Sequence, residues 1–588
     1  MGKKILKMLT FVIGFGFIIN TYSDNQREEV DLGKIVITPY LESKVSSIQN
    51  LSSCVRVITK EDIKNSTATT VIDVLRKTSL LDIKDWYGTG IKVSVDLMGF
   101  GDAASSNTLI LLDGIPLNSI DLSGVDWSII PLESVERIEI IKGEGAVLYG
   151  DNAIGGIVNI ITKKAKENKL ILKAEKGSYD LHRENIVFQG IYGNLSLTVD
   201  SEHFSTDGYR INSQYRSRKV FAKITHSNKK TKIKTEAIHH RYNYGLPGDL
   251  LETEINNPYS RKDSKDPLDN TEGEENFLRF SLTKNFIDET SDLNLQISYR
   301  NKNMYSNYIS SNYYSKENIH YLTIKPFIYL EKNILFPKDI FIVGGEFNFV
   351  DYSSDSFDNT SLTSASDVNR KGLAVFSNLH HYLTDNLILN YGFRHQREKF
   401  NFDYEDYKWG YAPLDEDKIL NEQAYEVGIN YKTKKAKYFF RYSKAFRIPK
   451  TDEFVVWDWS VPKISLNSSL DLQKSHTFIC GFNHQFLWFS LDFDVFYTEL
   501  KNEIYYDNNL FKNTNYPHSK RTGIDLKIKK EFKKTSFNLD YSLVKAKFEK
   551  GIYQGSYIPG VPKNKVNFSF YYHPYDFLDL FCNLHYIR

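Results

Sequence analysis

From about Lys169 onward, the chain repeats short runs in which apolar and polar residues alternate. Residues 491–495 (LDFDV), 537–541 (FNLDY) and 566–570 (VNFSF) are three of about nineteen such runs. Each run has roughly the 9–11 residues that a tilted strand needs to cross a bilayer. Because successive side chains of a strand point to opposite faces, the repeat predicts a transmembrane antiparallel β-barrel with lipid-facing and lumen-facing residues in alternation.

The connections between these runs differ in length in a regular order. Counting strands from Leu170, every long connection follows an odd strand and every short connection follows an even strand. This order predicts one barrel end that faces the exterior and one that faces the periplasm, and a soluble β-sandwich or propeller has no reason to sort its loops in this way. The long connections fall near residues 204–216, 243–275, 351–370, 401–420, 445–473 and 503–518, and the short ones near 193, 229, 289, 385, 434, 488 and 574.

The first residues predict export. Lys3, Lys4 and Lys7 precede an apolar stretch over residues 8–19, and small residues follow at 21 and 23. This apolar core is too short to span a bilayer, so residues 1–23 are expected to be a cleaved signal peptide.

The bulk composition excludes several classes. A formal net charge of +2 gives no support to a nucleic-acid partner, and the mean hydropathy of −0.41 fits a barrel whose two faces average out. The three cysteines, Cys54, Cys480 and Cys582, are too far apart to indicate a disulfide framework or a metal site.

Residues 45–164 show a different pattern, with short strands and two helical stretches, one of them capped by Thr69 or Thr70. Residues 107–118 (NTLILLDGIPLN) and 135–163, including LYG at 148–150 and AIGGIVNIIT at 153–162, resemble the plug of TonB-dependent outer-membrane receptors. Residues 442–449 (YSKAFRIP) are similar to a phrase in an outward loop of the same family.

The resemblance implies an α/β plug (residues 45–164) inside a barrel (residues 165–588), preceded by a periplasmic segment (residues 24–44). The family usually has about 22 strands, and a single-chain barrel closes with an even number. Since Tyr557–Pro562 resembles a phrase that several strands normally follow, we expect the barrel sequence to lack about three C-terminal strands.

Two positions depart from the family pattern. Met98 stands before Gly99 where the family usually has arginine, and Lys142 replaces an arginine before Gly143. Such arginines are expected to hold the plug to barrel carboxylates. Lys142 keeps the charge without the bidentate fork, and Met98 keeps neither. The resemblance therefore implies a plug that is released more easily, unless other contacts compensate.

The periplasmic segment contains an alternating stretch that resembles a TonB box. It is expected to add as an extended strand to a sheet edge of TonB, where backbone hydrogen bonds supply the affinity. An ordinary linker is the alternative. The box residues are Lys34, Ile35, Val36, Ile37 and Thr38, followed by Pro39.

Ligand contacts are expected from outward plug loops, at Trp86 and Tyr87 and at Asn107, since aromatic rings stack well on a chelate. Packing aromatics are the alternative. The histidine pairs 239–240 and 380–381 have no acidic partners at ligand spacing, so no metal site and no cofactor are expected. An acidic loop could hold Ca²⁺, although it lacks the spacing of a calcium loop and is expected to be solvated; it comprises Asp263, Asp266, Asp269, Glu272, Glu274 and Glu275.

The resemblance therefore implies active import of a ferric siderophore, with TonB, the chelate and outer-membrane lipid as partners. Cobalamin import is the alternative, and a passive pore or surface-binding barrel is the alternative of another class. Haem is less favoured, because residues 446–472 contain no histidine. No clustered nucleophile or carboxylate pair indicates an enzyme.

Overall fold

The computed structural model describes residues 18–19, 52–66, 68–86, 88–90, 92–143, 145–256, 258–286, 291–333, 339–458, 463–575 and 577–588. None of the helices in these ranges has the length and apolar character needed to cross a membrane.

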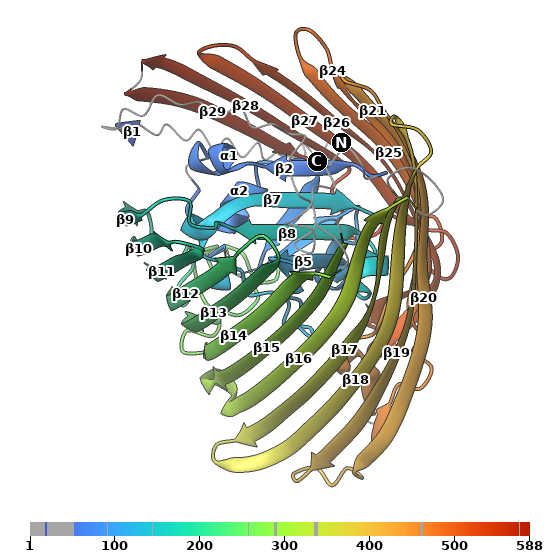
Figure 1. Ribbon diagram of the computed structural model, residues 1–588. Helices are drawn as coiled ribbons and strands as arrows, with labels where there is room; N and C mark the ends of the chain where they lie inside the picture. Colours follow the sequence, from blue (N-terminus) through green and yellow to red (C-terminus); the bar gives the residue numbers. More distant parts are fainter. Residues whose placement is uncertain are drawn as a thin grey trace, which may run out of the picture.

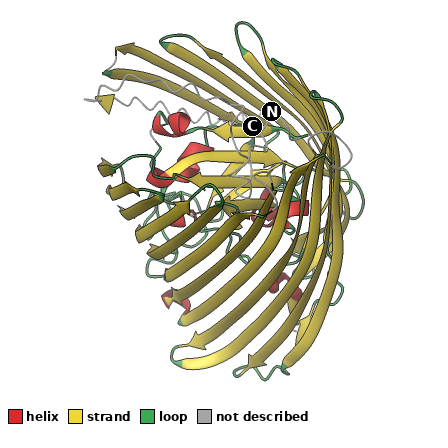
Figure 2. Ribbon diagram, viewed as in Figure 1, coloured by secondary structure: helices red, strands yellow, loops and turns green. Residues whose placement is uncertain are grey.

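Nineteen strands, β9–β21 and β24–β29, form one large curved sheet around the plug (Figures 1 and 2). Each strand pairs antiparallel with the next strand of the series, and Ile18–Ile19 (β1) pairs with β29. The expected count of about nineteen is confirmed. The bounds are β9 Lys169–Gly177, β10 Leu181–Tyr192, β11 Leu195–Thr206, β12 Tyr215–Ser227, β13 Thr231–Gly245, β14 Asn270–Asn285, β15 Ser291–Tyr308, β16 Tyr313–Lys332, β17 Asp339–Asp358, β18 Ser361–Tyr382, β19 Leu387–Asp406, β20 Leu414–Lys432, β21 Ala436–Arg447, β24 Gln473–Gln485, β25 Ser490–Asp507, β26 Lys512–Glu531, β27 Thr535–Phe548, β28 Asn564–Tyr575 and β29 Leu578–Ile587.

The connection lengths correct part of the sequence prediction. The longest connections, at residues 246–269, 448–472 and 549–563, follow odd strands as expected. Three expected long loops, near 351–370, 401–420 and 503–518, are instead mostly strand, because the hairpins β17–β18, β19–β20 and β25–β26 stay paired almost to their tips. Pairing between the strands satisfies the backbone N–H and C=O groups of these segments. Their side chains are mostly polar, so the sequence does not indicate that they form strands.

The acidic loop is also shorter than expected. Glu272, Glu274 and Glu275 lie on β14, where Glu274 accepts a hydrogen bond from Arg241 and Glu275 accepts one from Arg300. These three carboxylates therefore belong to a strand of the barrel wall and not to a loop.

The plug is an α/β module with a five-stranded sheet in the order β2-β7-β8-β5-β6, in which only β5 and β8 are parallel. A separate hairpin, β3–β4, lies beside it. The elements are β2 Val55–Ile58, α1 Lys60–Lys64, α2 Val71–Leu75, β3 Leu81–Asp85, β4 Val93–Leu97, η4 Gly101–Ser106, β5 Thr108–Leu112, β6 Ile115–Pro116, η5 Trp127–Ile129, η6 Leu132–Ser134, β7 Val135–Lys142, α3 Ala146–Tyr149 and β8 Gly156–Thr162.

Helix α2 begins where the sequence predicts. Thr70 is its N-cap, and the Thr70 hydroxyl accepts a hydrogen bond from the Asp73 amide while the Asp73 carboxylate accepts one from the Thr70 amide. This reciprocal pair satisfies two of the amides that have no partner within the helix.

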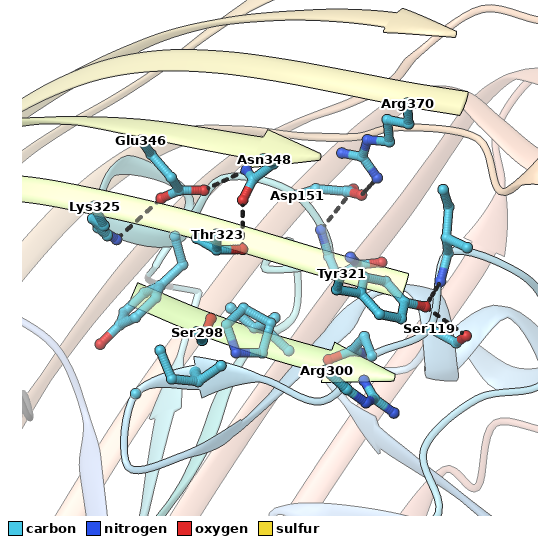
Figure 3. Close-up of a pocket in the computed structure, with 18 of the residues that line it drawn as sticks. Ser119, Asp151, Ser298, Arg300, Tyr321, Thr323, Lys325, Glu346, Asn348 and Arg370 are labelled. Atoms are coloured by element: carbon cyan, nitrogen blue, oxygen red, sulfur yellow. Dashed lines mark hydrogen bonds and ion pairs between the residues drawn. The ribbon is translucent and has the colours of Figure 1, made fainter. Parts of the chain in front are cut away.

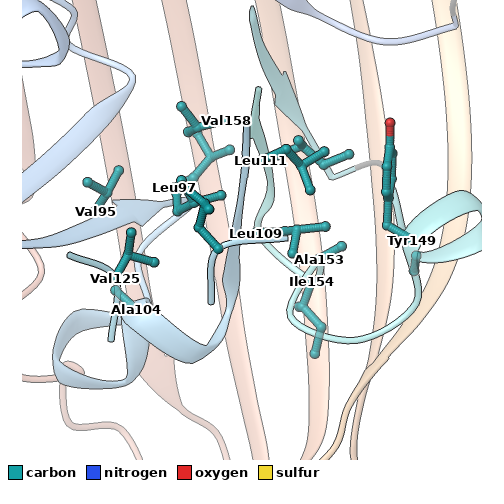
Figure 4. Close-up of a cluster of buried hydrophobic side chains, with 14 of the residues drawn as sticks. Val95, Leu97, Ala104, Leu109, Leu111, Val125, Tyr149, Ala153, Ile154 and Val158 are labelled. Atoms are coloured by element: carbon teal, nitrogen blue, oxygen red, sulfur yellow. The ribbon is translucent and has the colours of Figure 1, made fainter. Parts of the chain in front are cut away.

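The plug core packs around the central strands, with side chains such as Leu97, Leu111 and Val158 completely or almost completely buried (Figure 4). At Gly155 and Gly156, at the edge of this core, the neighbouring backbone leaves no room for a Cβ atom. A Cβ on Gly155 would lie 2.5 Å from the carbonyl oxygen of Leu97, and one on Gly156, at φ +132°, 2.1 Å from that of Ile141. Neither position therefore admits a side chain without movement of the backbone.

The plug lies within the curve of the barrel (Figure 1). Inward-facing barrel side chains reach its backbone: Lys219 Nζ donates to the carbonyl of Ser128 at 2.9 Å, and Ser443 Oγ to that of Gly143 at 3.0 Å. Along each barrel strand, alternate side chains thus make polar contacts with the plug on the inner face, and the side chains between them form the membrane-facing surface.

Candidate functional site

A cavity of about 120 Å³ lies between the plug and the barrel wall. Plug residues 109–120 and 149–152 form one side, and strands β14–β19 form the other (Figure 3). Ligand pockets for small molecules usually enclose about 300–1,000 Å³. This gap is therefore too small for a whole chelate.

Two cationic side chains in the barrel wall of this cavity, Arg300 and Lys325, each contact both the barrel and the plug. Arg300 binds the barrel carboxylate of Glu275, and its Nη1 donates to the plug carbonyl of Leu117 at 2.8 Å. Lys325 lies 3.1 Å from Glu346 and donates to the carbonyl of Leu148 at 2.5 Å. Each cation therefore joins a barrel carboxylate to the plug backbone.

Arg370 and Tyr321 complete this wall (Figure 3). Arg370 Nε donates to Glu398 at 2.8 Å, and its guanidinium lies 4.0 Å from plug Asp151. Tyr321 OH accepts a hydrogen bond from the amide of Ile120 at 2.9 Å. The plug turn at residues 117–120 is thus fixed by polar groups from two neighbouring strands, β15 and β16.

The connection between β21 and β24 folds inward onto the same face of the plug. Its helix α4 covers Thr451–Phe454, and a Glu453 carboxylate caps the turn by accepting from the Lys450 amide. Four hydrogen bonds dock this segment, residues 448–454, which we call the docking loop. They join Ile448 N to Asp151 Oδ1 (2.9 Å), Lys450 Nζ to Ser119 O (2.7 Å), Thr451 N to Ile120 O (3.1 Å) and Leu122 N to Asp452 Oδ2 (3.0 Å).

Burial of Lys450 makes the docking loop sensitive to pH. The residue is 4% exposed, and burial lowers the pKa of its ammonium from 10.5 to about 8. A released loop would bind more protons than a docked one between these two values, so docking strengthens as pH rises from about 8 to about 10.5. We expect exchange of the Thr451 amide, corrected for its intrinsic rate, to slow across this window. Lys450→Met should abolish the pH dependence; an unchanged profile in that variant would contradict the assignment.

Buried ion pairs anchor the opposite part of the plug. Lys142 binds Asp494, at 2.5 Å, and Asp525, with all three side chains at most 3% exposed. Burial opposes its charge, but the two carboxylates raise the pKa of Lys142 above its ordinary value. Arg56 adds a second link, 3.1 Å from Asp492. Lysine thus serves at the position where the family usually has arginine.

At Met98 the barrel supplies the missing cation. Arg521, on β26, donates from Nε to the carbonyl of Gly99 at 2.9 Å and stacks over the ring of Phe100 at 4.5 Å. Glu503 pairs with the same guanidinium. The plug is therefore held here by a barrel arginine on a plug carbonyl, and the expected weakness at Met98 is offset.

The predicted contact residues lie in different surroundings. Trp86 follows β3 and is 57% exposed. Asn107 is fully buried: its amide donates to Ala103 O at 2.8 Å, and its oxygen accepts from Gln473 at 2.7 Å. Tyr87 and the predicted TonB box, residues 34–38, lie outside the described residues. Sequence reasoning missed Lys450, although it directly follows the FRIP motif at 446–449.

A large antiparallel sheet that carries a folded plug on its inner face defines an outer-membrane receptor of the plugged-barrel class. The model of the TonB-dependent receptor plug domain matches residues 47–157, and that of the TonB-dependent receptor-like β-barrel matches residues 194–586. The chain therefore belongs to the family of TonB-dependent receptors of the outer membrane. This is a family of receptors and not of enzymes.

Individual relatives agree with the fold. The vitamin B12 transporter BtuB of Vibrio cholerae serotype O1 (strain M66-2) is 33% identical over 181 residues, 30% of this chain and 28% of the relative. Curated relatives are matched over only 18–28% of their own length. The ferric yersiniabactin uptake receptor FyuA from Yersinia pestis has a TM-score of 0.73 at 16% identity, over 89% of this chain and 83% of that chain. The ferric-catecholate import receptor Fiu from E. coli K12, in its closed form, has a TM-score of 0.77 at 15% identity, over 94% and 88%.

Proposed function

We propose that this receptor imports a metal chelate across the outer membrane with energy delivered by TonB. The observation that supports this most is the plug, which is held in the barrel by buried ion pairs of Lys142 with Asp494 and of Arg56 with Asp540. Breaking a buried pair by withdrawing one partner costs about 3–5 kcal/mol. Passage of a chelate past such a plug requires work, which argues against a passive pore.

The route of energy delivery in this proposal is the segment Lys34–Thr38, pairing with TonB as an added strand. Tension on that segment would act on the plug, whose first described residues, 52–54, lead into strand β2 of the central sheet. Loss of the contacts of Lys142 and Arg56 would then free the plug from the wall.

Two chelates are candidates for the ligand. A ferric siderophore is the ligand that the sequence resemblance favours, and the fold neighbours include receptors for such compounds. Cobalamin is supported by a separate observation, since the matched curated relatives at 33–35% identity are vitamin B12 transporters. We assign Trp86 and Tyr87 to direct contact, and Asn107 to holding the outward segment in place through Gln473.

Uptake in a strain that lacks its own receptors distinguishes these ligands. Cells that express the chain are expected to accumulate radiolabelled cobalamin or a labelled ferric siderophore, and to lose accumulation when TonB is deleted. Accumulation of one compound alone identifies the ligand. Equal uptake with and without TonB would refute active import, and a general leak of small solutes would indicate a pore.

A further inference from the structure

The outer face of β12 carries two arginines at one end. Ser217, Lys219 and Phe221 are buried toward the plug, so the alternate residues Arg216, Arg218 and Val220 face away from it. Lys219 confirms this direction, because its ammonium donates to plug carbonyls. Arg216 and Arg218 thus project from the outside of the barrel, near the connection 207–214 that lies on the side of the long loops.

An apolar band ends directly below these arginines. The same face of β12 continues with Val220 and Ile224, which are 43% and 44% exposed. Neighbouring strands extend the band with outward residues that include Ile186, Phe188, Leu195 and Leu278. Alternate residues of a strand are about 7 Å apart. Arg218 therefore lies one step beyond the band and Arg216 two steps beyond it, at the level of lipid headgroups.

The strand register leaves the arginine charges poorly compensated. Arg218 lies directly opposite Arg241 on β13, and like charges in opposed positions destabilise a sheet. Arg241 has a carboxylate partner, Glu274 at 2.7 Å. Across the described ranges, the guanidinium groups of Arg216 and Arg218 make no hydrogen bond or ion pair, although both backbones pair with β11 and β13. On the other side of Arg218, the residue directly opposite is His203 on β11, and Glu184 on β10 lies opposite His203.

A recess of about 500 Å³ opens beside Arg216. Lys262 and the exposed ring of Tyr209 line it, with the ammonium 5.8 Å from the ring centre. Arg210 also lines it, although its guanidinium donates to the carbonyls of Asp263 and Pro247. Asp207 contributes one carboxylate to the lining. Among the described residues that line this recess, cations thus exceed carboxylates.

We propose that Arg216, Arg218 and Lys262 bind the phosphorylated headgroup of an outer-leaflet lipid. Guanidinium forks match phosphate oxygens in bidentate geometry, and a phosphate between Arg218 and Arg241 neutralises the opposed charges. The recess at Tyr209 accommodates the headgroup, and the apolar band below lies along the acyl chains. This site is on the outside of the barrel and is independent of the chelate pathway in the lumen.

The full chain in detergent tests this proposal by native mass spectrometry with bisphosphorylated lipid A as the probe. The variant Arg216→Gln/Arg218→Gln is expected to bind the lipid roughly tenfold to thirtyfold more weakly, since each cation near an anionic lipid surface contributes substantially to binding. Arg216→Lys/Arg218→Lys should recover part of the affinity, because it restores charge without the fork. Both variants alter exposed side chains, and retention of the compact barrel on unheated gels checks their folding.

Two controls decide the specificity. Arg397, on β19, is another exposed outward cation, opposite Leu373 and Asn421; Arg397→Gln should leave lipid binding unchanged. Dephosphorylated lipid A should bind the unaltered chain as weakly as bisphosphorylated lipid A binds the double glutamine variant. Equal loss in the Arg397 variant, or equal binding of the dephosphorylated lipid, would overturn the proposal.

Discussion

Substitution of Lys142 by methionine is expected to detach the plug from the wall at a deeply buried anchor. The change leaves the Asp494 and Asp525 carboxylates facing each other, nearly unexposed and without the ammonium between them. Removal of one partner from a buried ion pair destabilises by about 3–5 kcal/mol. The urea concentration that releases the plug should fall accordingly. Trp127, which is buried in the plug and donates to Val93 O, reports the release by fluorescence when the other five tryptophans are replaced by phenylalanine.

Charge-matched variants separate the loss of the ion pair from the loss of packing. Lys142→Arg should keep most of the docking stability, whereas Lys142→Met combined with Asp494→Asn and Asp525→Asn should recover much of it, because no uncompensated charge remains. If the triple variant is as unstable as Lys142→Met alone, packing of the lysine chain and not its charge holds the plug.

Substitution of Val36 by proline is expected to abolish uptake while ligand binding stays intact. Proline removes the backbone N–H and fixes φ, so the segment 34–38 can no longer pair fully as an added strand. Since transport needs that pairing and binding at the outer surface does not, uptake of labelled chelate should fall to the level of a TonB deletion. Binding to whole cells at low temperature should match that of the unaltered receptor.

The matched control at this position is Val36→Thr, which retains the N–H and a β-branched side chain. It should transport at nearly the normal rate, because strand addition tolerates varied side chains. Parallel loss of binding and uptake in Val36→Pro would contradict the TonB-box assignment, and normal uptake would do so as well.

The barrel was predictable from sequence because its physical signal is local. Alternation within a run such as residues 491–495 follows from one lipid face and one lumen face, and it marks β25 correctly. The tips of β17 and β18 were not predictable in this way. Residues such as Asp355 and Ser366 are polar, and the sequence pattern predicts a loop there. In the structure their backbones pair as a hairpin that extends the sheet.

The site was less predictable because it is assembled from distant segments. Arg300, Tyr321 and Arg370 come from three strands, and each is an ordinary lumen-facing residue when its own strand is read alone. Only the tertiary structure shows that Arg300 and Tyr321 contact the plug turn at residues 117–120 and that Arg370 lies beside plug Asp151. In the same way, Arg521 compensates for Met98 across 423 sequence positions, a relation that no local motif reports.

The conformation of the docking loop depends on whether the plug is in place. Its shape depends on hydrogen bonds to Ser119, Ile120 and Asp151, so departure of the plug removes the template that orders it. Because loop residues such as Lys450 and Phe454 are buried in the resting receptor, an antibody against this segment would bind from outside only those receptors whose plug has departed. Under the TonB-driven mechanism proposed above, the fraction of receptors in transport at any moment would become measurable on living cells, without access to the periplasm.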